Sequence, residues 1–196
     1  MNALSAAVAL VRNPSGFMQS NKDAPAKEGD VMKYAAVLAA IPFVATLIGD
    51  LWYFDAVFHV SNFAGFAIVE AVLLYLFDVA AVYILGVVIR TLASSFGSSP
   101  DPVKALKLAA YTYTPAFLIA VVFVFPILDI LGILGLLYGL YVLYIGLPIM
   151  LGTPKEKAIP YVFVTLIAVI IIYFVFAAII GVVVAAAFHP PIGLFY

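Results

Sequence analysis

The chain has 196 residues, of which 67% are apolar and only 10% are charged, and its mean hydropathy is +1.23. Soluble proteins are roughly half apolar and a quarter charged, so this composition excludes a water-soluble fold and predicts a polytopic membrane protein. The net charge of -1 argues against binding to nucleic acid, and the absence of Cys excludes disulfides and thiolate metal sites.

Residues 1–33 are expected to form an interfacial helix and a polar linker. The apolar run from Ala3 to Val11 is about nine residues long, which is too short to span a membrane. Its apolar residues recur at helical spacing and Arg12-Asn13-Pro14 ends the run, which predicts a short helix in the cytoplasmic interface. The polar stretch from Gln19 to Asp30 predicts a solvated linker.

Residues 34–196 are expected to form one transmembrane domain with five spans. A spanning helix needs about 20 mostly apolar residues. Five stretches meet this requirement, at about 34–54, 63–89, 108–125, 127–147 and 161–188.

The third and fourth spans come from one apolar stretch, residues 108–151, which Pro126 and Asp129 interrupt. It could form a hairpin that turns at these residues, or one long kinked span. A kinked span would place Lys155 and Lys157 across the membrane from the other seven basic residues. The hairpin keeps all nine on one side, so the charge distribution favours it.

This charge asymmetry also predicts the orientation. By the positive-inside rule, the segments that carry the basic residues are cytoplasmic, which places the N-terminus inside and the C-terminus outside. The predicted fold is therefore all-α, a bundle of five transmembrane helices in contact with the lipid bilayer. The basic residues are Arg12, Lys22, Lys27, Lys33, Arg90, Lys104, Lys107, Lys155 and Lys157.

Glu70 and Asp78 are ionisable residues within the second span, where an ionised group costs about 2.5–3.5 kcal/mol at the bilayer centre. On a helix they are about 12 Å apart along the axis and about 80° apart around it, so both could flank one inward face. They could form a proton or cation path, or they could hydrogen-bond to neighbouring helices and fix packing. The sequence favours packing, because no basic residue lies at matching depth.

Tyr111 and Asp129 could line such a path. Tyr111 lies in the polar cytoplasmic half of the third span, close to Pro115, and Asp129 lies at the predicted outer turn. Carbonyl groups freed near Tyr111 could bind a ligand, although repacking around a proline kink is the commoner explanation.

A metal site on the outer side is the weakest alternative. Asp50, His59 and Glu70 are its best candidate ligands, but no two of the available side chains have the close spacing of a ligand pair on one helix face. Ser, His and Asp residues are also too dispersed to indicate a nucleophilic triad. We therefore expect no metal, no cofactor and no enzymatic activity.

The fourth span has two distinctive faces. Gly135 and Gly139 form a small-residue pair that allows another helix to approach closely, which could mediate a homo-oligomer or contact with another membrane protein. Tyr138, Tyr141 and Tyr144 form a stripe at helical spacing, which is typical of a packing and hydrogen-bonding seam.

Four segments together are similar to a known family. The third span carries Ala110-Tyr111-Thr112-Tyr113-Thr114-Pro115, and the tyrosine-rich fourth span ends in Gly146-Leu147-Pro148. A turn with Thr153-Pro154-Lys155-Glu156-Lys157-Ala158 and Tyr161 follows, and Arg12-Asn13-Pro14-Ser15-Gly16-Phe17 opens the chain. This pattern resembles the prokaryotic branch of the Yip1 domain family.

The resemblance implies a five-helix domain with a cytoplasmic N-terminus in the cytoplasmic membrane of a prokaryote. Eukaryotic members are associated with Rab GTPases, but this chain lacks their long acidic N-terminal region and their Asp-Leu-Tyr-Gly-Pro type motif. The expected function is that of a non-enzymatic scaffold, adaptor or membrane-organising factor. The alternative is a small ion- or proton-coupled transporter or channel that uses Glu70 and Asp78.

Overall fold

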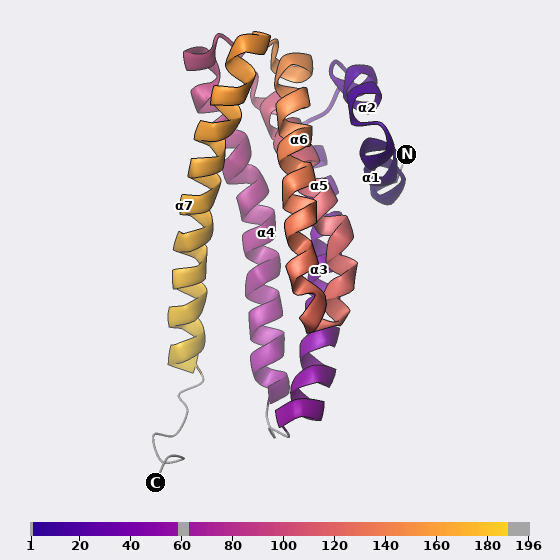
Figure 1. Ribbon diagram of the computed structural model, residues 1–196, viewed down its shortest axis with the longest axis vertical. Helices are drawn as coiled ribbons and strands as arrows, with labels where there is room; N and C mark the ends of the chain where they lie inside the picture. The colour runs from indigo at the N-terminus through magenta and orange to yellow at the C-terminus, as the bar shows by residue number, and fades with distance from the viewer. Residues whose placement is uncertain (1, 59–62, 188–196) are drawn as a thin grey trace.

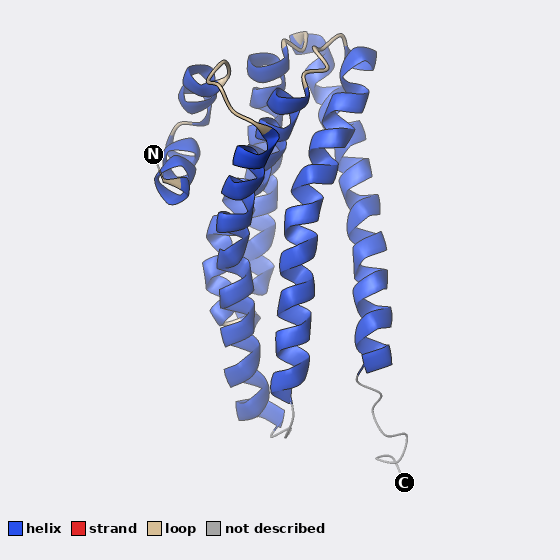
Figure 2. Cartoon of the chain, turned by 180° about the vertical axis from the view of Figure 1, so that it is seen from behind, coloured by secondary structure: helices blue, strands red, loops and turns tan. Residues whose placement is uncertain are grey.

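The computed structural model describes residues 2–58 and 63–187, and the side chains of residues 2–53 and 64–183. Within these residues the regular structure is entirely helical, without any strand (Figure 2). The elements are α1 Ala3–Arg12, α2 Pro14–Asn21, α3 Glu28–Phe58, α4 Phe63–Ala93, the 3-10 helix η1 Ser94–Phe96, α5 Pro102–Ile119, the 3-10 helices η2 Ala120–Val124 and η3 Pro126–Leu131, α6 Gly132–Leu151 and α7 Lys155–Ala187 (Figure 1).

Five of these helical segments are long and apolar enough to cross a membrane, which confirms the predicted number of spans. Several extend beyond their predicted limits. α3 begins at Glu28 because the Asp30 carboxylate accepts a hydrogen bond from the Lys27 N–H (3.0 Å), which caps the first turn within the expected linker. α5 begins at Pro102, where the Asp101 side chain accepts a hydrogen bond from the Lys104 N–H (2.9 Å).

The predicted hairpin between the third and fourth spans is confirmed. η2 and η3 are separated by Phe125, whose extended backbone (φ -114°, ψ 94°) reverses the chain immediately before Pro126. The Trp52 indole N–H on α3 donates a hydrogen bond to the Val124 carbonyl (2.6 Å). This contact attaches the turn to α3 and satisfies a carbonyl that a continuing helix would have used.

α5 lies at the centre of the bundle and packs against α3, α4 and α6. Its buried side chains run almost continuously along its length, and many are small, so that neighbouring helices approach from several sides. The buried residues include Ala105, Leu106, Leu108, Ala109, Ala110, Thr114 and Phe117.

The glycine face of α6 packs against α5 of the same chain. Gly135 and Gly139 are buried, and a Cβ at Gly135 would lie 2.7 Å from the Ala116 Cα. A Cβ at Gly139 would collide with the Thr112 carbonyl oxygen. The close approach expected at these glycines therefore occurs within one molecule, and this face is not available to a second copy.

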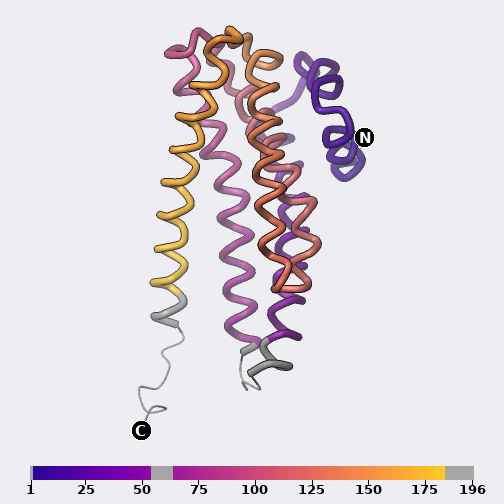
Figure 3. Tube along the Cα trace, in the orientation of Figure 1, coloured from indigo at the N-terminus to yellow at the C-terminus, as the bar shows by residue number. Residues whose placement is uncertain are grey.

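The N-terminal segment is docked on the side of the bundle. Ala7, Leu10 and Met18 are fully buried against it, and the pair formed by α1 and α2 lies beside only the upper half of the bundle in Figures 1 and 3. The expected short helix corresponds to α1. The sequence analysis missed α2, which starts where Asn13 accepts a hydrogen bond from the Gly16 N–H (3.0 Å) and Pro14 occupies the first turn.

The α5–α6 contact makes a prediction about stability. Replacing Gly139 with Leu forces a side chain against the backbone of α5, so we expect Gly139→Leu to lower the free energy of unfolding by about 1–3 kcal/mol or more. The matched control is Gly181→Leu on α7, where nothing lies within 4 Å of the added Cβ. Thermal unfolding of the purified variants in detergent measures the difference. Equal midpoints for the two variants would contradict the close contact.

Candidate functional site

Glu70 and Asp78 on α4 line the same cavity, which has a volume of about 350 Å³. The cavity lies between α4, α5 and α7, and the two carboxylates that line it are eight positions apart on α4. Helical spacing predicted that the two carboxylates could flank one inward face, and both lie on the wall of one cavity. The other lining residues include Phe66, Leu74, Phe77, Ala81, Tyr113, Val169, Tyr173, Phe176 and Ala177.

Neither carboxylate has a polar partner among the described residues. No hydrogen bond or ion pair of Glu70 or Asp78 occurs in this part of the chain, and both side chains are partly buried. Tyr113 on α5 and Tyr173 on α7 lie close enough to Asp78 to interact with its charge. Among the described side chains, the bonds to Tyr or Thr that would explain the carboxylates as packing residues are therefore not present.

A second cavity of about 350 Å³ adjoins the first, and the two share Tyr113, Val169 and Tyr173 as lining residues. Its remaining wall is almost wholly aliphatic and comes from α4, α5, α6 and α7. The two cavities together form a crevice along the inner side of α7, with carboxylates in one part and apolar side chains in the other. The lining of the second part includes Leu85, Leu136, Leu140, Leu143, Leu166, Ile170 and Phe174.

α7 is attached more loosely than the other spans. It packs along α4 and α6, and no residue of its most apolar 18-residue stretch is buried, whereas half of the residues in the corresponding stretch of α5 are buried. The crevice exists because α7 does not close on α5, so Tyr113 on α5 remains exposed to the cavities.

Tyr111 and Asp129 do not join this site. Tyr111 lines a different cavity of about 240 Å³, between the N-terminal segment, α3 and α5, where its ring packs edge-on against Phe17 and Tyr34. Asp129 is exposed on η3, and Asp50 on α3 lies near enough to interact with it and with Glu70. The four predicted intramembrane residues therefore occupy three places in the structure.

Two of the three candidate metal ligands lie near each other. Asp50 and Glu70 lie on adjacent helices, and His59 lies outside the described residues. The described side chains contain no group of three or more His, Asp or Glu residues that could hold a metal ion.

The tyrosine stripe of α6 has two environments. The Tyr138 hydroxyl donates a hydrogen bond to the Val11 carbonyl at the end of α1 (2.8 Å), which fixes the N-terminal segment to the bundle. Tyr141 packs edge-on against Tyr138, and both Tyr141 and Tyr144 are exposed on the outer surface. Among the described contacts, Tyr138 alone of the three tyrosines makes the expected hydrogen bond to another helix.

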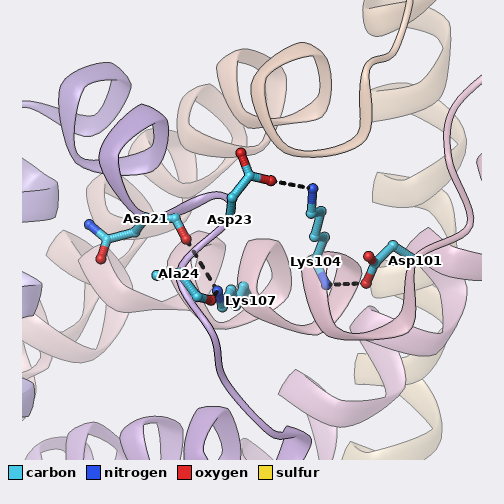
Figure 4. A network of polar contacts seen from close by, with 6 residues as sticks. All are labelled: Asn21, Asp23, Ala24, Asp101, Lys104 and Lys107. Atoms are coloured by element: carbon cyan, nitrogen blue, oxygen red, sulfur yellow. Dashed lines mark hydrogen bonds and ion pairs between the residues drawn. The ribbon is translucent and has the colours of Figure 1, made fainter.

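Lys107 is the most important polar residue that the sequence analysis did not single out. Its side chain is only 5% exposed, and its ammonium group donates hydrogen bonds to the carbonyl oxygens of Ala24 (2.6 Å) and Asn21 (3.1 Å), as Figure 4 shows. The Asn21 carbonyl ends α2, and the Ala24 carbonyl lies in the connection between α2 and α3. Lys107 therefore holds the N-terminal segment in place. In the sequence, nothing except its position one turn after Lys104 pointed to this role.

A weaker polar contact, an exposed ion pair, lies beside Lys107. Lys104 forms an ion pair with Asp23 (2.7 Å), at the surface of the same turn (Figure 4). The hydrogen bond from Lys104 and the nearby positive charges hold the pKa of Asp23 below its usual range, against a smaller opposing effect of desolvation. Because Asp23 is exposed, this pair contributes little to stability compared with the buried Lys107.

A buried cluster closes the basic end of the bundle, defined as the end where Arg90, Lys104 and Lys155 lie. Tyr161 is fully buried on α7, stacks on Phe96 (ring centroids 4.4 Å apart) and donates a hydrogen bond to the Ile89 carbonyl. The Thr153 hydroxyl donates to the Leu147 carbonyl (3.0 Å) and pairs with the Ser98 hydroxyl (2.7 Å). These contacts join α4, α6 and α7.

The five apolar spans define a multi-pass α-helical membrane protein. The sequence model of the Yip1 domain matches residues 8–179, so the chain belongs to the Yip1 domain family. Inner membrane protein YohC of Escherichia coli K12 is 30% identical over 136 residues, which cover 65% of this chain and 69% of the relative. The protein of the same name from Escherichia coli O6:H1 is equally similar.

These comparisons confirm the resemblance that the motifs indicated, and with the five spans they confirm the expected placement as a multi-pass protein of a cytoplasmic membrane. No solved structure matches the chain.

The network around Lys107 gives a testable difference between two neighbouring lysines. We expect Lys107→Met to loosen α1 and α2, because it leaves two carbonyls without a donor at a cost of about 1–3 kcal/mol. Lys104→Met, the matched control one turn away, removes only an exposed ion pair. Because the chain has no Cys, a single Cys at the buried position Ala7 reports undocking through its rate of alkylation. Similar rates in both variants would show that Lys107 does not hold the segment.

Proposed function

We propose that this protein is a non-enzymatic membrane-organising factor, which acts through a cross-section that is larger at its basic end than at its opposite end. The observation that carries this proposal is the docking of α1 and α2 against one half of the bundle only (Figure 1). As a scaffold or adaptor of this shape, it influences neighbouring lipids and membrane proteins without a catalytic site.

The lengths of the helices support the same asymmetry. α3, α4 and α7 have 31 to 33 residues and are about 46–50 Å long, whereas the third span, α5 with η2, has 23 residues and the fourth span, η3 with α6, has 26. The turn between α5 and α6 stops short of the lower ends of α3 and α4 in Figure 1. The opposite end therefore contains fewer helices than the basic end.

The additional width at the basic end is fixed rather than transient. The α1–α2 pair buries Ala7, Leu10 and Met18 against the bundle and is held by Lys107 and Tyr138 through main-chain carbonyls. On its outer side, α1 exposes Leu4 and Val8, as suits a helix lying in the apolar part of a membrane interface.

The physical consequence follows from lipid packing. A rigid protein that displaces more area in one leaflet than in the other has a lower free energy in a bilayer curved to match, where the crowded leaflet is the convex one. Interfacial helices act on membranes in the same curvature-dependent way. By the positive-inside rule, the wider end would lie in the cytoplasmic leaflet.

This proposal predicts curvature sorting whose direction depends on orientation. The fluorescently labelled protein is reconstituted into giant vesicles, and its density on pulled membrane tubes is compared with its density on the flat parent membrane. We expect enrichment on tubes when the basic end faces the convex outer leaflet and depletion when it faces the lumen. Lys107→Met should reduce both effects, and Gly181→Leu should leave them unchanged. Equal densities in both orientations would contradict the proposal.

A second candidate function is ion- or proton-coupled transport, which one observation favours: Glu70 and Asp78 line the same cavity within the membrane. A flux assay in proteoliposomes separates it from the first. Transport requires that the wild-type protein moves protons or cations down a gradient and that Glu70→Gln and Asp78→Asn reduce the flux. No flux over a broad panel of ions would exclude this function and leave membrane organisation unaffected.

A further inference from the structure

We propose that the crevice along α7 binds a lipophilic organic cation, with its positive charge beside Asp78 and its apolar part in the neighbouring aliphatic cavity. This site is independent of the membrane-organising function and of the basic end of the bundle.

The cavity contains two carboxylates and no basic side chain among its lining residues. Asp78 and Glu70 line it without a hydrogen-bond or ion-pair partner among the described residues. The closest basic residue along α4 is Arg90, 12 positions and about 18 Å from Asp78. An ionised carboxylate at this depth is costly unless a positive charge compensates it, and none of the described residues pairs a positive charge with Asp78 or Glu70.

The walls of the cavity indicate which kind of positive charge fits. Aromatic rings from three helices line the same cavity as Asp78, including Phe77 on α4, Tyr113 on α5 and Phe176 on α7. Phe77 and Phe176 stack on each other (ring centroids 4.4 Å apart) and form one wall. Aromatic faces attract cations, and together with a carboxylate they favour an alkylated ammonium or phosphonium over a hydrated metal ion.

The second cavity specifies the rest of the ligand. It shares Tyr113, Val169 and Tyr173 with the first and is lined mainly by Leu and Ile, so it suits a hydrocarbon or aromatic body. Two cavities of about 350 Å³ each lie in the size range of sites for small organic molecules. An amphiphilic ligand with a charged part and an apolar part would occupy both.

The depth of the site separates this ligand from a phospholipid. Asp78 lies near the middle of α4, about 22 Å from Phe63 and about 18 Å from Arg90. Headgroups of bilayer lipids lie at the interface, near the ends of this helix. A cation that is itself lipophilic reaches the middle of the membrane and can enter the cavity on the side where α7 does not pack closely against α5.

Binding of two ions of the same shape and opposite charge tests the proposal. Purified full-length protein in lipid nanodiscs is titrated with tetraphenylphosphonium and, separately, with tetraphenylborate. We expect saturable binding of the phosphonium above the linear partitioning into empty nanodiscs, and no saturable binding of the borate. Saturable binding of neither ion, or equal binding of both, would overturn the proposal.

Variants then locate the site. Asp78→Asn should weaken phosphonium binding about tenfold or more, since it removes the charged partner in a desolvated place, and Glu70→Gln should weaken it less. Asp129→Asn, an exposed carboxylate outside the crevice, should bind as the wild type does. Unchanged affinity in Asp78→Asn would place the ligand elsewhere and refute the site.

A further variant keeps the test decisive if Asp78→Asn should fold poorly. Ala177 lines the cavity, so Ala177→Phe adds a ring that fills it while both carboxylates remain. We expect it to weaken phosphonium binding without lowering the thermal midpoint. Retained affinity in this variant would contradict occupancy of the cavity.

Discussion

The rest of the structure depends on the contact between the glycine face of α6 and the backbone of α5. Gly135 and Gly139 let α6 approach until the Thr112 carbonyl and Ala116 fill the space that a side chain would need. Lipid tails are as apolar as Leu, so helices in a membrane associate through such close packing rather than through hydrophobic burial. The α5–α6 hairpin formed in this way is the unit around which α3 and α4 are arranged.

The central position of α5 has consequences at both of its ends. Its first turns are surrounded by other helices, so the Lys107 side chain is largely buried and donates to carbonyls at the end of α2 and in the segment that follows it. Further along α5, the side that faces α7 is left open, and Tyr113 lines two cavities. α5 therefore anchors the N-terminal segment at one end and, further along, lines an unfilled crevice beside the last span.

Hydropathy and charge predicted much of the fold, and the remainder depended on contacts distant in sequence. The five spans and the α5–α6 hairpin follow from the lengths of apolar runs and from the side on which Lys155 and Lys157 lie. Helical spacing also placed Glu70 and Asp78 together. The docking of α1 and α2 was not predictable, because Lys107 and Tyr138 bond to main-chain carbonyls, which leave no side-chain pattern in the sequence. The glycine face of α6 likewise packs against the backbone of α5, so the sequence could not tell whether its partner was α5 or a second copy of the chain.

The residues that identify the family mostly build the architecture. Thr153 and Tyr161 join helices at the basic end, and Thr114 bonds to Tyr34 on α3 (2.8 Å). Family membership therefore fixes how the helices pack and says little about a ligand. Two residues of the third-span motif are exceptions, because Tyr113 lines both cavities and Thr112 lines the second. The motif thus meets the candidate site at these two side chains, whereas both carboxylates lie outside the motif on α4.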